Sequence, residues 1–363
     1  MKHRLLYLDS LRGISCTLIL IYHTLRFFES ETINFILALG RIGTDVFFVI
    51  SGFLAAIAAK KIIEGKATPF NFLAPRLNRI YTVFIFSLIT AALVIPIFIG
   101  GLSYLKSHSL EFNFFEYSTL EWIKIITLTR VFDAENWELY RAFLPINGVY
   151  WFISQIIQIY IFIFAALNFK KYFKTIVCVG ALMSLATLTT SGHESIPYGF
   201  FLPNFCKFFF GMAAYWIFES YPPRPSLGLK FASLVTISIA ILFGVYIENE
   251  WLLRPSWAIS IAFLIYCASA FDESLSKNII LIFFSKIGAF SFSVYLLHAP
   301  LIPLSDMISR NIAGKNHIIF SSILSICMTF MFCWIWSRFF EILGSFKKSL
   351  QSLKHPLKTL KPD

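Results

Sequence analysis

Arg12 and His23 are the two residues best suited to chemistry, and they stand where a polar N-terminal segment runs into an apolar one. Their spacing of eleven positions makes about three turns of an α-helix, so both lie on one face, about 16 Å apart along its axis. Asp9 falls close to the same face. The apolar run begins near Ile14, which places His23 near the middle of a hydrocarbon core about 30 Å thick. Ionisable side chains at that depth are costly and usually functional.

His298 is a second histidine expected at mid-depth, in the segment from Ser291 to Pro300 that also contains Tyr295. A neutral imidazole can take a proton from a hydroxyl group and return it. Pro300 would open the helix locally and free a carbonyl group. The two histidines could therefore line one cavity. The alternatives are a histidine satisfied by a neighbouring helix and a structural histidine beside a proline kink.

Arg76 and Arg79 lie three positions apart at the inner mouth of a predicted span, and Lys60 and Lys61 add positive charge at the same mouth. Positions i and i+3 share a helix face. Two guanidinium groups on one face can hold a phosphate in bidentate fashion. The alternative interpretation is a pair of cytoplasmic anchors that only orient the chain.

Asp45 and Gly52 belong to the segment Gly43–Phe53, which enters the membrane from outside. Small residues at helical spacing on this face favour close helix packing. Asp45 is a candidate catalytic residue, as the partner of a cation such as protonated His23. Gln155 and Gln158, in a later span, are expected to make packing hydrogen bonds, with contact to a polar substrate as the alternative.

The composition is that of a membrane protein, with 57% hydrophobic and only 14% charged residues. Soluble domains usually have about 25% charged residues. Continuous apolar runs favour helices over a β-barrel. The net charge of +11 fits basic cytoplasmic loops. The sequence has no basic stripe with interleaved aromatic residues, so it does not indicate nucleic-acid binding. The six cysteines lie in apolar runs, and the seven histidines show no metal-ligand spacing.

The apolar runs predict an all-α integral membrane protein with about ten transmembrane helices. With this count both termini lie on one side, and the excess of lysine and arginine places them in the cytoplasm. We expect one membrane domain over residues 1–345 and a basic cytoplasmic tail over 346–363.

The N-terminal run reads as an uncleaved first span. The segment around Ile279–Phe284 could be an interfacial helix or part of the ninth span. The predicted spans are 10–28, 42–59, 80–99, 149–167, 175–190, 199–218, 231–247, 256–271, 287–307 and 318–340. The long loop 100–147 is expected to carry a short interfacial helix near Leu120–Thr129.

These motifs occur in an order that resembles the membrane-bound acyltransferase 3 family, of the type without an extra esterase-like domain. The family's LDxLRG…H pattern is matched by Leu8–Gly13 and His23. Its other segments resemble Gly43–Phe53, Arg76–Tyr81 and Ser291–Pro300. There are departures: Gln155 stands where an acidic residue is common, and Asn204 and Lys207 replace an arginine and a glutamate.

The resemblance implies transfer of an acyl group, usually acetyl, from cytoplasmic acyl-coenzyme A to a hydroxyl of a lipid-linked or surface carbohydrate such as O-antigen, capsule or exopolysaccharide. It implies a protein of the bacterial inner membrane with acyl-coenzyme A as co-substrate and no permanently bound cofactor. His23 and Asp45 are then the catalytic candidates. Two alternatives stay open, a transporter or scaffold of lipid-linked sugars, and transfer of a succinyl or longer group. The candidate residues for binding coenzyme A or the acceptor are Arg12, Arg76, Arg79, Tyr295 and His298.

Overall fold

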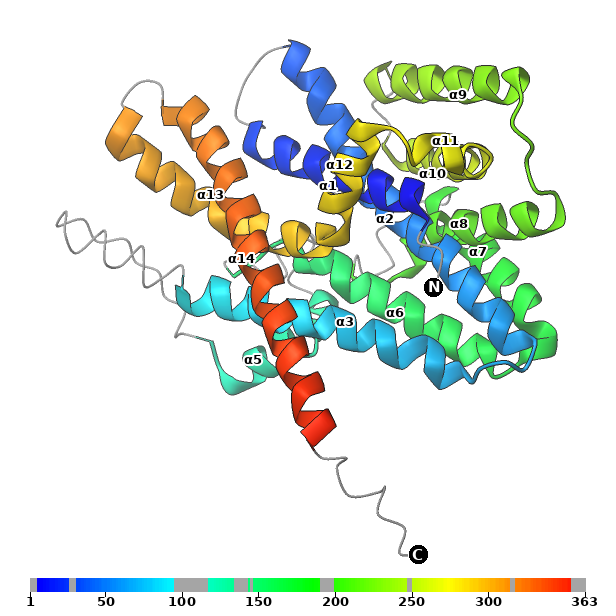
Figure 1. Ribbon diagram of the computed structural model, residues 1–363, viewed down its shortest axis with the longest axis horizontal. Helices are drawn as coiled ribbons and strands as arrows, with labels where there is room; N and C mark the ends of the chain where they lie inside the picture. The colour runs from blue at the N-terminus through cyan, green and yellow to red at the C-terminus, as the bar shows by residue number, and fades with distance from the viewer. Residues whose placement is uncertain are drawn as a thin grey trace, which may run out of the picture.

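A computed structural model gives the fold and describes residues 5–25, 31–94, 117–133, 143, 146–189, 199–246, 250–313 and 317–353. Every regular element in these ranges is a helix, which confirms the predicted all-α class (Figure 1). The longer helices are α1 (Leu6–Leu25), α2 (Glu31–Ile63), α3 (Pro69–Ile89), α6 (Tyr150–Leu167), α7 (Phe173–Thr189), α8 (Leu202–Ser220), α9 (Leu227–Tyr246), α10 (Glu250–Ser269), α12 (Ile279–Ala289), α13 (Ser291–Ala313) and α14 (His317–Leu353). The shorter ones are the π-helix η1 (Thr90–Val94), α5 (Thr119–Ile126), the 3₁₀ helices η3 (Thr129–Phe132) and η5 (Lys170–Tyr172), and α11 (Asp272–Leu275).

Each of the ten predicted spans overlaps a helix, and some of these helices are long and apolar enough to cross a bilayer. Four segments meet that test in the described ranges: Ile42–Ile63, Pro69–Ala92, Tyr150–Leu167 and Ile318–Trp336. The helices Ile279–Ala289 and Ser291–Arg310 meet the test only when taken together, and they are bent by 70° to one another, as in a broken span or a re-entrant loop. The uncertain segment near Ile279 is therefore helix α12, set at an angle to α13. The chain is an all-α membrane protein, while the count of ten and the cytoplasmic termini stay predictions.

Two glycine pairs bring helices into close contact. A Cβ atom on Gly13 would overlap the carbonyl of Phe284, where α1 crosses α12, and Gly288 meets the backbone of Asp9 at the same crossing. Gly52 of α2 faces the backbone of α8 in the same way, and Gly211 of α8 faces α2. The predicted packing role of the Gly52 face is confirmed. Only glycine lets two helix backbones approach this closely.

Helix α3 begins earlier than the sequence predicted. The sequence predicted a span from residue 80, but α2 ends in a turn at Gly65, whose φ of 76° suits glycine, and α3 starts at Pro69. Proline is favoured in the first turn of a helix, where its missing N–H has no partner to lose. As a result Arg76 and Arg79 belong to the helix itself.

Pro300 frees a carbonyl group in α13, as predicted, and the structure shows what binds it. A proline nitrogen has no hydrogen to donate to the carbonyl four residues earlier, which belongs to Leu296. That oxygen accepts instead from Ser87 Oγ at 3.0 Å and Asn147 Nδ2 at 2.7 Å. These two bonds tie α13 to α3 and to the segment that precedes α6.

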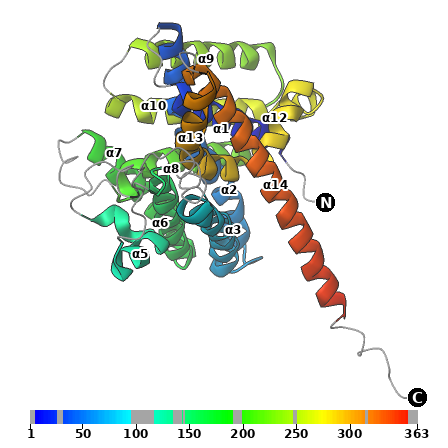
Figure 2. The same ribbon diagram turned by 90° about the vertical axis from the view of Figure 1, so that its left-hand side faces the viewer.

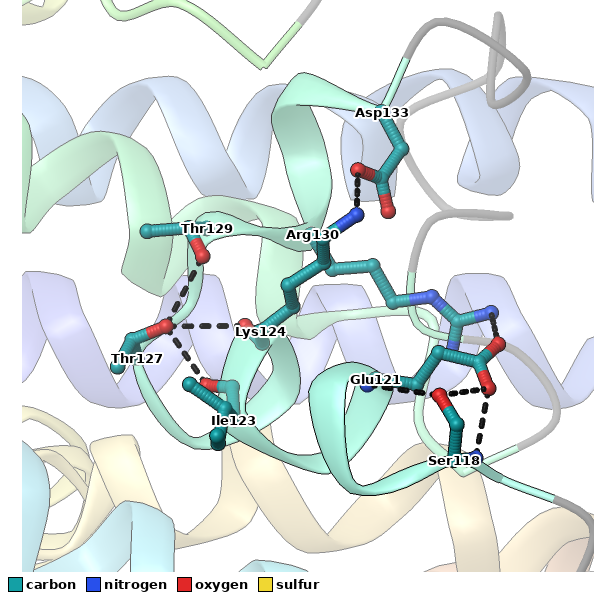
Figure 3. A network of polar contacts seen from close by, with 8 residues as sticks. All are labelled: Ser118, Glu121, Ile123, Lys124, Thr127, Thr129, Arg130 and Asp133. Atoms are coloured by element: carbon teal, nitrogen blue, oxygen red, sulfur yellow. Dashed lines mark hydrogen bonds and ion pairs between the residues drawn. The ribbon is translucent and has the colours of Figure 1, made fainter.

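The described part of the long loop forms the predicted short helix, α5, followed by η3 (Figure 3). Ser118 and Glu121 form a capping box, with the Ser118 N–H donating to Glu121 Oε2 at 2.8 Å. This bond lowers the pKa of the Glu121 carboxyl group. Ser154 Oγ of α6 donates to the Leu128 carbonyl at 2.8 Å, so this segment is fixed to the helix bundle.

Helix α14 leaves the bundle and continues toward the C-terminus as one long rod (Figure 2). It continues to Leu353, so the tail predicted from residue 346 does not begin at a break in the helix. Residues 354–363 of that tail lie outside the described ranges.

Candidate active site

The two predicted membrane histidines meet. The ring centroids of His23 on α1 and His298 on α13 are 4.9 Å apart, with the ring planes tilted by 40°. His298 is fully buried, whereas His23 is half-buried. Two imidazoles in contact form a pair that can hold and pass a proton.

Aromatic rings and backbone groups fix this pair. Tyr22 meets the His23 ring edge-on at 4.9 Å. The Tyr295 ring lies 5.8 Å from His298, and its hydroxyl donates to the Val149 carbonyl at 3.2 Å. Tyr295 is only 3% exposed. In this structure its side chain contacts protein groups and helps to hold His298 in place. Its predicted contact with a substrate stays a prediction.

The three predicted arginines also come together, at the other end of α1. Arg79 of α3 lies near enough to both Arg12 and Arg76 for the positive charges to repel one another. Arg12 is held by Asp9, with Nη1 3.3 Å from Oδ1. The Arg76 guanidinium stands 5.5 Å from the ring of Tyr160. A concentration of like charge is unfavourable by itself and is suited to bind an anion.

Arg76 and Arg79 differ in how tightly they are held. Arg76 donates to the carbonyls of Phe72, at 2.8 Å, and Leu54, at 3.3 Å, and is half-buried. Arg79 is exposed. No hydrogen bond or ion pair of Arg79 is present among the described residues, so its donors are available to a ligand.

Asp45 does not pair with His23, contrary to the interaction suggested from the sequence. Its Oδ1 atom lies 2.6 Å from Lys207 Nζ, and the two side chains are 7% and 3% exposed. Lys207 reaches Asp45 because the Gly52–Gly211 crossing brings α2 against α8. A carboxylate already neutralised by a lysine is a structural ion pair first, and its catalytic role stays a prediction.

The sequence departures in two spans contact each other. Asn204 Nδ2 donates to Gln155 Oε1 at 2.8 Å, with both side chains buried. Gln158 donates to the Gly199 carbonyl at 2.8 Å. The predicted packing role of the two glutamines is confirmed.

Sequence reasoning missed the structural role of Lys207, and it missed Tyr160, Ser87 and Asn147 altogether. The role of Lys207 could have been predicted from the sequence, because a lone lysine inside an apolar run needs a buried counterion. The role of Ser87 and Asn147 could not have been predicted, since it depends on a carbonyl group that is freed in a helix distant in the sequence.

Comparison with known proteins shows the family to which the chain belongs. A family model described as an acyltransferase domain matches residues 5–338, nearly the whole chain. The chain belongs to the acyltransferase 3 family. The chain is also similar to "Protein 2 in picA locus" of Rhizobium radiobacter, with 36% identity over 101 residues. That match covers 27% of this chain and about half (50%) of the relative. No solved structure matches.

Proposed function

We propose that this acyltransferase 3 protein transfers an acyl group, most simply acetyl, from acyl-coenzyme A to a hydroxyl of a carbohydrate. The acceptor is a lipid-linked or surface glycan, and the site is the bacterial inner membrane. Arg12, Arg76 and Arg79 bind the phosphates of coenzyme A on the cytoplasmic side. His23 acts on the acceptor hydroxyl.

The observation that carries this proposal is the arrangement of two sites on one helix. Arg79 lies near both Arg12 and Arg76, and the histidine pair includes His23, about 16 Å further along α1 from Arg12. The pantetheine arm of coenzyme A is comparable to four extended residues, with a reach of about 14 Å. A donor held by its phosphates at Arg12 therefore presents its thioester close to His23.

The chemistry follows from these positions. His23 accepts the proton of the acceptor hydroxyl as the oxygen attacks the thioester carbonyl. The carbon–sulfur bond then breaks, and the leaving thiolate takes a proton from the His23 imidazolium. The products are an ester and free coenzyme A. Direct transfer is the simpler of two routes; the other passes through an acyl group carried briefly on His23.

The test uses purified protein in lipid nanodiscs with radiolabelled acetyl-coenzyme A and glycan acceptors. We expect label to move to the acceptor, and His23→Ala to reduce the rate by about 10²–10⁴-fold, the usual contribution of general-base catalysis. Normal transfer by a well-folded His23→Ala protein would exclude His23 as the base. Label that stays on coenzyme A while a glycan crosses the membrane would indicate a transporter, and a preference for succinyl-coenzyme A would correct the acyl group.

A further inference from the structure

We propose that His298 is a positioning residue, which accepts a hydrogen bond from a ring N–H of His23 and so fixes the tautomer that His23 uses. The inference rests on the proposed function for its catalytic meaning. The geometry itself does not depend on which substrate binds.

The hydrogen bond at His298 Nδ1 defines its tautomer. This atom lies 3.3 Å from the carbonyl oxygen of Val294. A carbonyl has no hydrogen to give, so a hydrogen bond here requires the proton to be on Nδ1. In the neutral ring the other nitrogen, Nε2, then carries a lone pair and can only accept.

The distance between the rings allows that lone pair to be used. With the ring centroids 4.9 Å apart and the planes tilted by 40°, a small rotation of either ring would bring a nitrogen of His23 within the usual hydrogen-bond range of Nε2, about 2.7–3.2 Å. A bond from His23 to Nε2 uses one nitrogen of His23 as donor. The other nitrogen is then the acceptor that faces a substrate hydroxyl.

The surroundings hold His298 still. The ring is fully buried, and Tyr295 packs beside it with its hydroxyl bonded to Val149. Two residues toward the N-terminus, the Leu296 carbonyl is held by Ser87 and Asn147, because Pro300 leaves it free. A ring fixed on this many sides is suited to orient a neighbour.

The proposed role balances without any further reactant. The hydroxyl proton moves to the free nitrogen of His23, and the N–H bonded to His298 stays in place. The hydrogen bond to His298 stabilises the resulting imidazolium. The imidazolium then gives the proton that came from the hydroxyl to the leaving thiolate. In this role His298 contacts neither the donor nor the acceptor. It orients His23 in the same way that the third residue of a catalytic triad orients the catalytic histidine.

The first test is spectroscopic and needs no activity. Protein with ¹⁵N-labelled histidine in nanodiscs, at a pH where both rings are neutral, reports which ring nitrogens carry hydrogen. We expect His298 to be protonated on Nδ1. We expect His23 to hold one tautomer in the wild type and in His298→Gln, whose side-chain oxygen can accept the hydrogen bond from His23. In His298→Phe, which keeps a ring without an acceptor, His23 should show both tautomers.

Two outcomes would overturn the proposal: a proton on Nε2 of His298, or an unchanged His23 tautomer in a folded His298→Phe protein. His317→Gln, at the start of α14, serves as the control for removing a histidine and assigns its signal.

The second test is kinetic. His298→Phe should lower kcat by about 10²–10⁴-fold with an unchanged KM for the acyl donor, and His298→Gln should recover most of the loss. Equal losses in the Gln and Phe variants would refute the positioning role. A wild-type protein that transfers no acyl group would instead refute the proposed function, and the tautomer measurement would still judge the histidine pair.

Discussion

At the scale of single residues, Asp45 and Lys207 form an ion pair that is almost completely buried. Its atoms are 2.6 Å apart in surroundings that exclude water. Two charges removed from water are tolerated only while they remain together, because each alone would keep its full cost of desolvation.

The first prediction is that Lys207→Met destabilises the protein by about 3–5 kcal/mol, since it leaves the Asp45 carboxylate buried and unpaired. The double variant Asp45→Leu/Lys207→Met should recover most of that stability. Thermal unfolding in detergent measures both, with Lys61→Met, an exposed lysine on α2, as control.

The same pair of variants separates structure from catalysis at Asp45. A folded double variant that still transfers acyl groups would show that Asp45 is structural. A folded double variant without activity would restore the catalytic role suggested from the sequence. A stable Lys207→Met protein would contradict the importance of the pair.

The second prediction concerns the two arginines of α3. Arg79 is exposed, whereas Arg76 is bonded to two backbone carbonyls. Arg79→Gln should therefore raise the KM for acyl-coenzyme A by about tenfold, with stability unchanged, because a charged phosphate contact is lost. Arg76→Gln should raise KM and also lower stability by about 1–2 kcal/mol.

Steady-state kinetics and thermal unfolding of both variants check this difference. Lys66→Gln is a suitable control, since Lys66 is exposed and pairs only with its near neighbour Glu64 among the contacts the structure describes. An unchanged KM in Arg79→Gln would remove that residue from the donor site.

At the scale of elements, glycine crossings determine where the site residues lie. The Gly13–Gly288 contact places α1 on α12, which precedes α13 and its His298. The Gly52–Gly211 contact places Asp45 beside Lys207. Close backbone approach therefore positions side chains that stand far apart in the sequence.

The third prediction is that Gly13→Ala and Gly52→Ala each destabilise the protein by about 1–3 kcal/mol, the usual cost of forcing extra volume into a packed interior. The new methyl group would meet a backbone carbonyl, which cannot rotate away. Gly228→Ala is the matched control, because nothing lies within 4 Å of its added carbon. A helical glycine in open space should tolerate alanine or gain stability.

Unfolding midpoints of the three variants in one detergent decide the matter. If all three glycine variants were equally stable, the crossings would not depend on the missing side chains.

At the scale of the whole molecule, the helices form a bundle from which α14 extends with its basic end (Figures 1 and 2). Exposed apolar side chains cover α9 and the first part of α14, among them Leu227, Phe231 and Ile323. Lipid tails are the natural neighbours of such surfaces. The excess of lysine and arginine in the predicted inner loops should then orient the bundle with these loops in the cytoplasm.

The fourth prediction is that both termini face the cytoplasm and the α5 segment faces outward. Green fluorescent protein fused after Asp363 should fluoresce, and alkaline phosphatase there should be inactive. A cysteine introduced at Thr127, an exposed position, should react with an impermeant thiol reagent in cells with a permeabilised outer membrane. The opposite pattern would reverse the orientation and place the arginine cluster away from cytoplasmic coenzyme A.

The sequence by itself determined the helical membrane class, the regions of the helices and the main chemical groups. Apolar runs and charge follow the cost of burying polar groups in lipid, which is a local property of the chain. The Arg12–His23 spacing is likewise local, because helix geometry converts eleven positions into a direction and a distance.

Only the tertiary structure decided which distant groups meet. It brought His298 to His23 and placed Arg79 near both Arg12 and Arg76. It also paired Asp45 with Lys207 and not with His23. It also bound the carbonyl freed by Pro300 to Ser87 and Asn147. These contacts depend on the angle and depth at which helices cross, and those are fixed by packing between segments that no local pattern relates.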